Sequence, residues 1–400
     1  MSYSYLDHSA YSPIAPEVLK TYVQALQQMT YTPGNPSSLH KGGLLAREKL
    51  ESAREKIAKI ICVKPSEVIF TSGGTEADNL GFISAAKKIQ EKSGRNVAIT
   101  SAIEHPGISS VYKILGKDAI NVIKIPVTSS GVVDLEVLEK IIRQHFNDIS
   151  VISVMLVNNE TGVIQPVKEI VQLVREIEQQ LHRTGDRIFV HTDAVQGFGH
   201  IPFNFVDLGV DAMSISGHKI SAPVGIGALI AKQDFPVGMI YSGGGQERGV
   251  RSGTIDVCGA LALSVACEKA IENLDVNIAR FSEYKAKIVK NLPDGVSVSS
   301  TAECSSHILH LVCEYGGADA LLFSLDNAGI CVSAGSACRA GVAQSSYVLE
   351  AMGYDGVYCS GGLRISFGSS TTMDDIDALI DALPLAVESA KSLHKIRFVG

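Results

Sequence analysis

Thr71-Ser-Gly-Gly-Thr-Glu-Ala-Asp-Asn79 decides the fold class, because it joins an apolar strand to the start of a helix. Gly73 and Gly74 allow a ligand to approach the backbone closely. Thr75, with Asp78 three residues on, resembles a capping box. The free N–H groups at a helix start carry about half a positive charge, which suits a phosphate group. The segment fits neither GxxxxGK[ST] nor GxGxxG, and an ordinary N-cap after a tight turn remains open for it alone.

Short apolar runs alternate with helical patterns on both sides of this segment, from about residue 40 to 235. Strands are expected at 67–70, 96–100, 120–126, 149–157, 188–191, 212–216 and 226–231. Such alternation predicts an α/β large domain with a mostly parallel, seven-stranded sheet covered by helices on both faces. Polar residues follow several of these strands, and ligands of open parallel sheets bind at those ends.

A smaller α+β C-terminal domain is expected after Pro293, where the pattern changes. Strands are predicted at 296–300, 307–312 and 363–367, and helices near 318–328 and from 373 onward. The helical stretch 255–292, if continuous, forms a spine between the two domains. We therefore expect a large domain at 16–262 and a small domain built from 1–15 and 263–400.

The composition narrows the classes of partner. The chain has 400 residues, 46% of them hydrophobic and 19% charged, so it can bury a large core. Its net charge of −7, without a basic block, argues against nucleic-acid binding. Its apolar runs are shorter than the roughly 20 residues that cross a bilayer, and the N-terminus does not have the pattern of a signal peptide. The 8 cysteines form no CxxC pair, so we expect a cytoplasmic protein with reduced thiols.

Two further segments place a carboxylate and an amine after strands. Asp193 ends Phe189-Val-His-Thr-Asp193, and a buried carboxylate there needs a partner such as a pyridinium nitrogen. Lys219 ends Ser216-Gly-His-Lys219, and near a buried site its pKa falls, which makes it a Schiff-base candidate. An internal salt bridge for Asp193 and an exposed position for Lys219 are the plain alternatives.

In that order, the three segments are typical of fold-type I enzymes that use pyridoxal 5′-phosphate (PLP). The chain resembles the NifS-like cysteine desulfurases, class-V aminotransferase-type enzymes of PLP-dependent transferase fold type I, in nearly every segment from Tyr5 to Gly368. The matching motifs are Tyr5-Leu-Asp7, Gly34-Asn-Pro-Ser-Ser-Leu-His40, Thr71-Ser-Gly-Gly-Thr-Glu76, Glu104-His-Pro106, Val157-Asn-Asn-Glu-Thr-Gly162, His191-Thr-Asp-Ala-Val-Gln196, Ser216-Gly-His-Lys219, Gly243-Gly-Gly-Gln-Glu-Arg-Gly249, Arg251-Ser-Gly-Thr254 and Ser333-Ala-Gly-Ser-Ala-Cys338.

The resemblance implies a role for each matching residue. Lys219 would form the Schiff base with PLP, Asp193 would keep the pyridine nitrogen protonated, and His105 would stack on the ring and move protons. The remaining roles are as follows: Asn159 and Gln196 at the ring hydroxyl; Gly74, Thr75, Ser216 and His218 at the phosphate; Thr254 at the phosphate of the opposite subunit in a homodimer; and Asn35, Asn159 and Arg364 at the substrate.

Cys338 would be the nucleophile that accepts sulfur. Its segment, Ser333-Ala-Gly-Ser-Ala-Cys-Arg-Ala-Gly341, is rich in small residues, which favours a loop. Arg339 beside it favours the reactive thiolate. For most of the other cysteines a small buried hydrophobe is the better interpretation.

Cys304, His307, His310 and Cys313 are spaced by three, which resembles a metal cluster. The segment has the pattern of a strand, however, and residues three apart on a strand face opposite sides. We therefore expect no metal there.

The resemblance implies that the chain removes sulfur from L-cysteine, gives L-alanine and a persulfide on Cys338, and passes the sulfur to an acceptor protein in iron–sulfur cluster assembly or a thiolation pathway. A selenocysteine lyase or another class-V transaminase or lyase is the nearest alternative. A non-catalytic scaffold of the same fold and a nicotinamide-dependent oxidoreductase are less consistent with these motifs.

Overall fold

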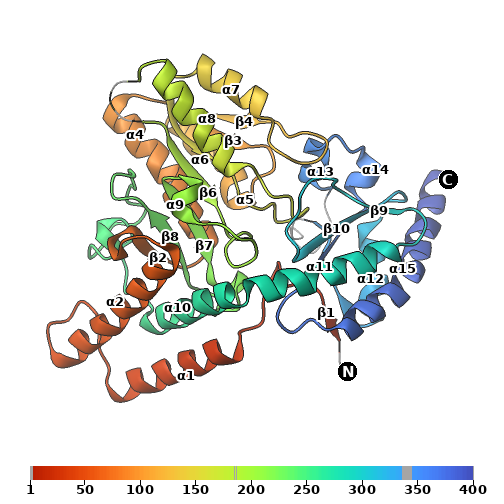
Figure 1. Cartoon of the computed structure of the whole chain (residues 1–400), viewed down its shortest axis with the longest axis horizontal. Coiled ribbons are helices and arrows are strands. Elements are labelled where there is room, and N and C mark those ends of the chain that lie inside the picture. The colour runs from red at the N-terminus through yellow and green to blue at the C-terminus, as the bar shows by residue number, and fades with distance from the viewer. Residues whose placement is uncertain (1–2, 184, 186, 336–344, 400) are drawn as a thin grey trace.

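The computed structural model describes residues 3–183, 185, 187–335 and 345–399. It has a larger part around a seven-stranded sheet and a smaller part built from both ends of the chain (Figure 1). The large sheet has the order β2-β8-β7-β6-β5-β3-β4. Its strands are β2 (Val68–Thr71), β3 (Val97–Ser101), β4 (Asn121–Ile125), β5 (Ile149–Ser153), β6 (Phe189–Asp193), β7 (Ala212–Ser216) and β8 (Gly227–Ala231).

The strand directions confirm a mostly parallel sheet of seven strands. Parallel pairing joins β7, β6, β5, β3 and β4, whereas β8 runs antiparallel to both β7 and β2. Successive residues of one strand enter different cores: Val68 and Phe70 pack on one face of the sheet and Ile69 on the other. Both faces are therefore covered, which explains why these strands are apolar throughout.

Helices form the two covering layers. Residues of α2, α7, α8 and α10 contribute to one core, and residues of α3, α4 and α6 to the other. The helices of this part are α1 (Pro16–Tyr31), α2 (Lys41–Ile61), α3 (Gly74–Asp78), α4 (Ala85–Ser93), α5 (Pro106–Ser109), α6 (Tyr112–Lys117), α7 (Leu135–Gln144), α8 (Val167–Gln180), α9 (Phe205–Leu208) and α10 (Val257–Glu272). A π-helix, η2 (Asn79–Ser84), joins α3 to α4, and short 3₁₀ turns are η1 (Pro65–Glu67), η3 (Gly217–Lys219) and η4 (Glu247–Gly249).

The smaller part has an antiparallel sheet of order β12-β10-β9, and β1 from the N-terminal end pairs with β11. Its elements are β1 (Ser4–Tyr5), α11 (Leu274–Lys290), β9 (Val296–Val298), β10 (Ile308–Cys313), α12 (Ala318–Asn327), β11 (Ile330–Cys331), α13 (Tyr347–Ala351), α14 (Gly356–Cys359), β12 (Gly362–Ser366) and α15 (Met373–Val399). The helical stretch expected at 255–292 is divided at Asn273 into α10 and α11. The expected domain boundary at residue 262 falls inside α10 and stays a prediction.

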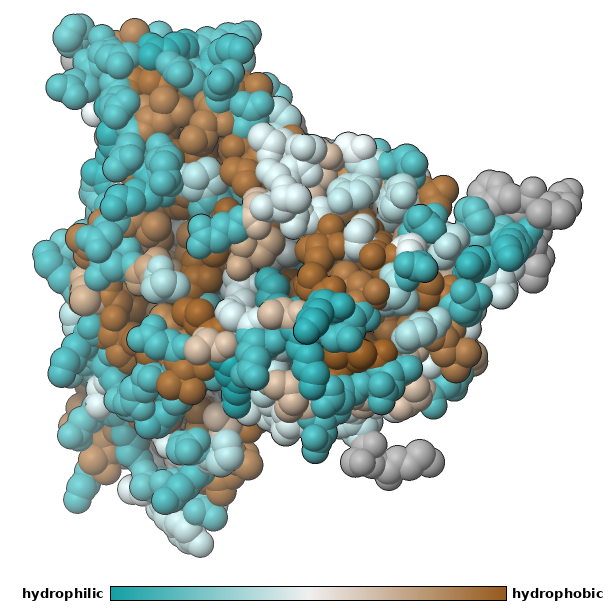
Figure 2. Space-filling view, turned by 45° about the vertical axis from the view of Figure 1, so that its right-hand side comes forward, coloured by the Kyte–Doolittle hydropathy of each residue, from teal (hydrophilic) through white to brown (hydrophobic). Residues whose placement is uncertain are grey.

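No helix within the described ranges is long and apolar enough to cross a membrane. On the face seen in Figure 2, hydrophobic residues reach the surface in patches among hydrophilic ones.

Candidate active site

A cavity of about 880 Å³ lies where the loops after the strands of the large sheet meet the smaller part of the molecule. The structure brings together ten of the residues singled out in the sequence. They are Gly74, Thr75, His105, Asn159, Asp193, Gln196, Ser216, His218, Lys219 and Arg364. Residues separated by almost three hundred positions therefore line one cavity, because the strand ends and β12 converge there.

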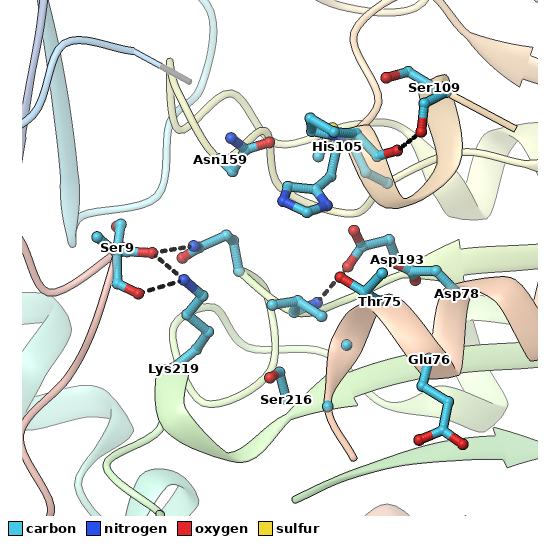
Figure 3. Close-up of a pocket in the computed structure, with 18 of the residues that line it drawn as sticks. Ser9, Thr75, Glu76, Asp78, His105, Ser109, Asn159, Asp193, Ser216 and Lys219 are labelled. Carbon is cyan, nitrogen blue, oxygen red and sulfur yellow. Dashed lines mark hydrogen bonds between the residues drawn. The ribbon is translucent and has the colours of Figure 1, made fainter. Parts of the chain in front are cut away.

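Lys219 ends η3, directly after β7. Its Nζ donates hydrogen bonds to the carbonyl oxygens of Ser9 (2.6 Å) and Ala10 (2.8 Å), as Figure 3 shows. The pKa of Lys219 is lowered to about 8. Burial is the main cause, and the positive charge of Arg364 contributes less. An appreciable fraction of this amine is therefore neutral near pH 7, as a nucleophile or base requires.

Asp193 stands at the carboxyl end of β6 and accepts a hydrogen bond from the Val195 amide at 2.8 Å. Burial raises its pKa, and burial also raises the pKa of Asp78, which the charge of Asp193 raises further. Two buried carboxyl groups that lie close together do not both ionise unless a cation compensates their charge. A protonated pyridine nitrogen meets that need.

His105 lies across the cavity from Lys219 and Ser216, close to Asn159 (Figure 3). It is the N-cap residue of α5, and its Nδ1 accepts a hydrogen bond from the Gly107 amide at 3.1 Å. Burial lowers the pKa of His105 to about 4, with smaller contributions from the charges of Lys219 and Arg364, so the ring is neutral at pH 7. A neutral imidazole can stack on a planar cofactor and exchange a proton.

The start of α3 differs in one detail from the expectation. Gly73, with φ of +152°, is the N-cap residue, and no side chain caps this helix start. The prediction of a capping box at Thr75 and Asp78 was therefore wrong. Asp78 is instead fully buried beside Asp193. Glu76 instead accepts the Ser72 amide at 2.6 Å.

Ser216 and His218 also line the cavity. Ser216 Oγ lies 3.0 Å from His218 Nδ1. Burial lowers the pKa of His218 to about 4, so this ring is neutral at pH 7. Hydroxyl and ring N–H groups beside the start of a helix can bind phosphate.

Arg364 lies on β12 with its side chain only 5% exposed. Its Nη2 pairs with Asp7 Oδ1 at 2.9 Å, and its Nη1 donates to the Asn159 carbonyl at 2.8 Å. Among the described residues, Arg364 Nε and Asn159 Oδ1 are buried without a hydrogen-bond partner. Polar atoms of this kind in a cavity wall need a polar ligand, such as a carboxylate or a hydroxyl-bearing ring.

Two expected residues lie outside this cavity. Asn35 is exposed before α2 and accepts the Ser37 amide at 2.9 Å, and Thr254 is exposed after η4. Cys338 falls outside the described residues. Ser345, the first described residue after that gap, lines the cavity.

Several groups in and around the cavity were not predicted from the sequence. The carbonyl groups of Ser9 and Ala10 give no sequence signal, because every residue has one. Tyr347 lines the cavity and donates to the Glu104 carbonyl at 2.6 Å. Burial raises the pKa of the Glu104 side chain to about 8. The position of Glu104 directly before His105 in the sequence was the signal that could have indicated it.

One histidine of the apparent metal cluster, His307, has other partners. His307 contacts Ser305 and Gln196 through its two ring nitrogens. Across the described ranges, no three His, Cys, Asp or Glu side chains are grouped to hold a metal ion.

Comparison with known proteins shows which family the chain belongs to. The pattern of the aminotransferase class-V family matches residues 4–379. An IscS-like cysteine desulfurase of Mycobacterium tuberculosis is 37% identical over 398 residues, which is 97% of each chain. The structure of a NifS-like protein superposes with a TM-score of 0.86 and 32% identity, covering 96% of this chain and 99% of that one. A structure of SspA in complex with cysteine gives a TM-score of 0.77 and 29% identity over 91% of this chain and 98% of that one. The chain belongs to the PLP-dependent class-V aminotransferase family, among its IscS- and NifS-like cysteine desulfurases.

Proposed function

We propose that this chain takes the sulfur atom from L-cysteine, releases L-alanine and leaves a persulfide on Cys338. The observation that carries the proposal is the meeting of Lys219, Asp193, His105 and Arg364 around one cavity of about 880 Å³. Amine, carboxylate, imidazole and guanidinium are the groups that a PLP-dependent reaction on an amino acid needs.

The residues present fit PLP. When bound, PLP supplies an electron sink that weakens the bonds at the α- and β-carbons of an amino acid. Lys219 would hold its aldehyde, and Asp193 its ring nitrogen. Asn159 and Gln196 would face the ring hydroxyl. The phosphate would lie at the other end of the cavity, against Gly74, Thr75, Ser216 and His218.

Arg364 would bind the substrate carboxylate, and Asn159 would face the substrate as well as the ring. Asn35, which lies outside the cavity of this single chain, stays a prediction from the resemblance. The unpartnered Nε of Arg364 supports its part, since a guanidinium binds a carboxylate through two parallel hydrogen bonds. The neutral fraction of Lys219 would remove the α-proton, and neutral His105 would exchange protons with the substrate thiol.

The sulfur step balances without an added oxidant. The Cys338 thiolate attacks the substrate sulfur, a new S–S bond forms, and the Cβ–S bond breaks. The electron pair of that bond stays with Cβ, which is then protonated to the methyl group of alanine. Cysteine and a thiol thus give alanine and a persulfide.

We also propose a homodimer. Leucine and tyrosine side chains are exposed on α1 and between α1 and α2, at Leu19, Leu26, Tyr31 and Leu39. Figure 1 shows these two helices extending from one side of the large sheet. Exposed apolar side chains of this kind support a subunit contact. Thr254, exposed in a single chain, would then reach the phosphate of the opposite subunit.

The test is to incubate the purified protein with PLP, L-cysteine and a thiol reductant, and to measure sulfide and alanine. We expect equal amounts of the two products, and no sulfide above background from Cys338→Ala. Normal sulfur transfer by Cys338→Ala would contradict the assigned nucleophile.

The alternatives give other outcomes. A selenocysteine lyase would release alanine from selenocysteine but not from cysteine, and a transaminase would convert PLP to its amine form without needing Cys338. The acceptor protein, in iron–sulfur cluster assembly or a thiolation pathway, and the cytoplasmic location stay predictions.

A further inference from the structure

His307 lies next to Gln196, one of the residues that line the cavity. Its Nε2 is 3.1 Å from Gln196 Oε1, and its Nδ1 is 2.6 Å from Ser305 Oγ. Both His307 and Gln196 are buried. The other end of the Gln196 amide, its Nε2, donates to the Ser9 carbonyl at 2.9 Å.

The Ser9 carbonyl fixes the direction of this whole chain of hydrogen bonds. A carbonyl oxygen only accepts, so Gln196 must present its NH₂ group to Ser9 and its oxygen to His307. His307 Nε2 must then carry the proton, because two acceptors cannot face each other at 3.1 Å. Its Nδ1 in turn accepts from the hydroxyl of Ser305.

The charge state of His307 agrees with this assignment. Burial lowers the pKa of His307 well below its ordinary value, and the neighbouring charges of His200, Lys285, Arg364 and His8 act in the same direction. The ring is therefore neutral and has one N–H to give. That N–H belongs to Nε2.

A stacking contact with a second histidine also holds the ring of His307. Its ring stacks on His200 with centroids 3.8 Å apart and planes 9° apart. His200 Nε2 lies 3.2 Å from the Lys219 carbonyl oxygen, which accepts a hydrogen bond from the Nε2–H group. The stacked pair therefore connects the main chain of Lys219 to the side chain of Gln196.

We propose that His307 is a positioning residue, which together with the Ser9 carbonyl holds the Gln196 amide so that its second N–H points at the ring oxygen of the cofactor. With the amide reversed, Gln196 would offer an acceptor to an oxygen that carries negative charge. The inference rests on the proposed place of Gln196 beside that oxygen. It gives a role to a histidine that first resembled a metal ligand.

The test is a spectrophotometric pH titration of the holoenzyme without substrate, which follows the visible band of the bound cofactor. A donor to the ring oxygen stabilises its negative charge and so weakens its hold on the proton shared with the nitrogen of Lys219. Loss of that donor in His307→Leu should raise the midpoint by about one pH unit, the size of one hydrogen bond to a charged group. His307→Gln, which keeps an N–H near the position of Nε2, should restore the midpoint.

His310 provides the matched control. It lies three residues away and is equally buried, and within the described part of the chain its two ring nitrogens have no hydrogen-bond partner. His310→Leu should leave the midpoint unchanged. If His307→Leu does not fold, Ser305→Ala tests the same chain, since it removes the hydroxyl that donates to Nδ1 and holds the ring against Gln196, and it should shift the midpoint in the same direction.

The outcomes separate the inference from its premise. If Gln196→Ala raises the midpoint but His307→Leu and Ser305→Ala do not, the inference is overturned. If Gln196→Ala leaves the midpoint unchanged, the placement of Gln196 is overturned and the inference with it. Production of alanine by the wild-type protein reports on the proposed function independently of both results.

Discussion

Arg364 and Asp7 form a partly buried ion pair, with Arg364 Nη2 2.9 Å from Asp7 Oδ1. The other oxygen of Asp7 accepts the hydroxyl of Ser333 at 2.7 Å. Asp7 comes from the N-terminal end of the chain and Arg364 from β12, so the two ends of the sequence meet at the proposed substrate site. The pair fixes the guanidinium before a substrate arrives, and orientation of this kind lowers the entropic cost of binding.

Replacing Arg364 by Lys should therefore raise the KM for L-cysteine by roughly 10- to 100-fold, because an ammonium cannot make the two parallel bonds of a guanidinium. The ammonium can still pair with Asp7, so the fold should persist. Initial rates over a range of cysteine concentrations measure the effect, and an unchanged cofactor absorption band shows that the site is intact. An unchanged KM would remove Arg364 from the substrate site.

Replacing Lys219 by Ala should abolish both the visible band of bound PLP and the formation of alanine, because the covalent link to the cofactor is lost. The matched control is Lys232→Ala, since Lys232 pairs with Asp211 away from the cavity. Absorption spectra and an alanine assay on both variants check the prediction. A visible band that survives in Lys219→Ala would contradict the assigned link.

The rate at which cofactor-free protein takes up PLP should depend on pH through Lys219. Only the neutral amine attacks an aldehyde, and the pKa of Lys219 is lowered to about 8. The rate should therefore rise roughly tenfold per pH unit below pH 8 and level off above it, whereas an ordinary lysine would show a rise up to about pH 10. Stopped-flow absorbance measures the profile.

Burial is the main cause of this low pKa, and the charge of Arg364 is the next. Arg364→Gln removes a cation that opposes protonation, so the midpoint of the uptake profile should move to higher pH in this variant. A midpoint that moves to lower pH would show that the two charges do not interact as the structure indicates.

Replacing Glu247 by Gln should lower the free energy of unfolding by about 3 kcal/mol, because it removes the buried carboxylate partner of Arg54 and leaves only the exposed Glu51. The side chain of Glu247 is 1% exposed, and its Oε1 lies 2.7 Å from Arg54 Nη2. Its Oε2 accepts a hydrogen bond from the Phe70 amide at 2.6 Å. Its φ of +47° and the φ of +62° at Arg248 show that the ion pair holds a strained turn ahead of Thr254. Denaturant unfolding measures the change.

Glu268→Gln is the control for this prediction. Glu268 pairs with Lys56 at 2.7 Å, but its side chain is 38% exposed, so its loss should change stability by less than about 1 kcal/mol. Equal effects of the two substitutions would show that burial of the Arg54 pair does not matter.

Much of the fold could be predicted from local patterns. Apolar runs and helical periodicity placed the strands of the large sheet to within a few residues, because a strand buried on both faces must be apolar throughout. The reversed direction of β8 could not be predicted, since a five-residue apolar run has the same pattern in either direction. The division at Asn273 was also missed, because neither glycine nor proline marks it.

The sequence by itself determined which chemical groups are available: the strand-end Asp193 and Lys219, the Gly73–Gly74 turn and the arginine of β12 are all visible as residue types in motifs. Only the tertiary structure decided how these groups are oriented. The carbonyl groups of Ser9 and Ala10 at Lys219, Asp7 at Arg364 and His307 at Gln196 come from positions far along the chain. The physical reason is that hydrogen bonding and burial depend on distance in space, and a local sequence pattern contains no information about groups that only folding brings within 3 Å.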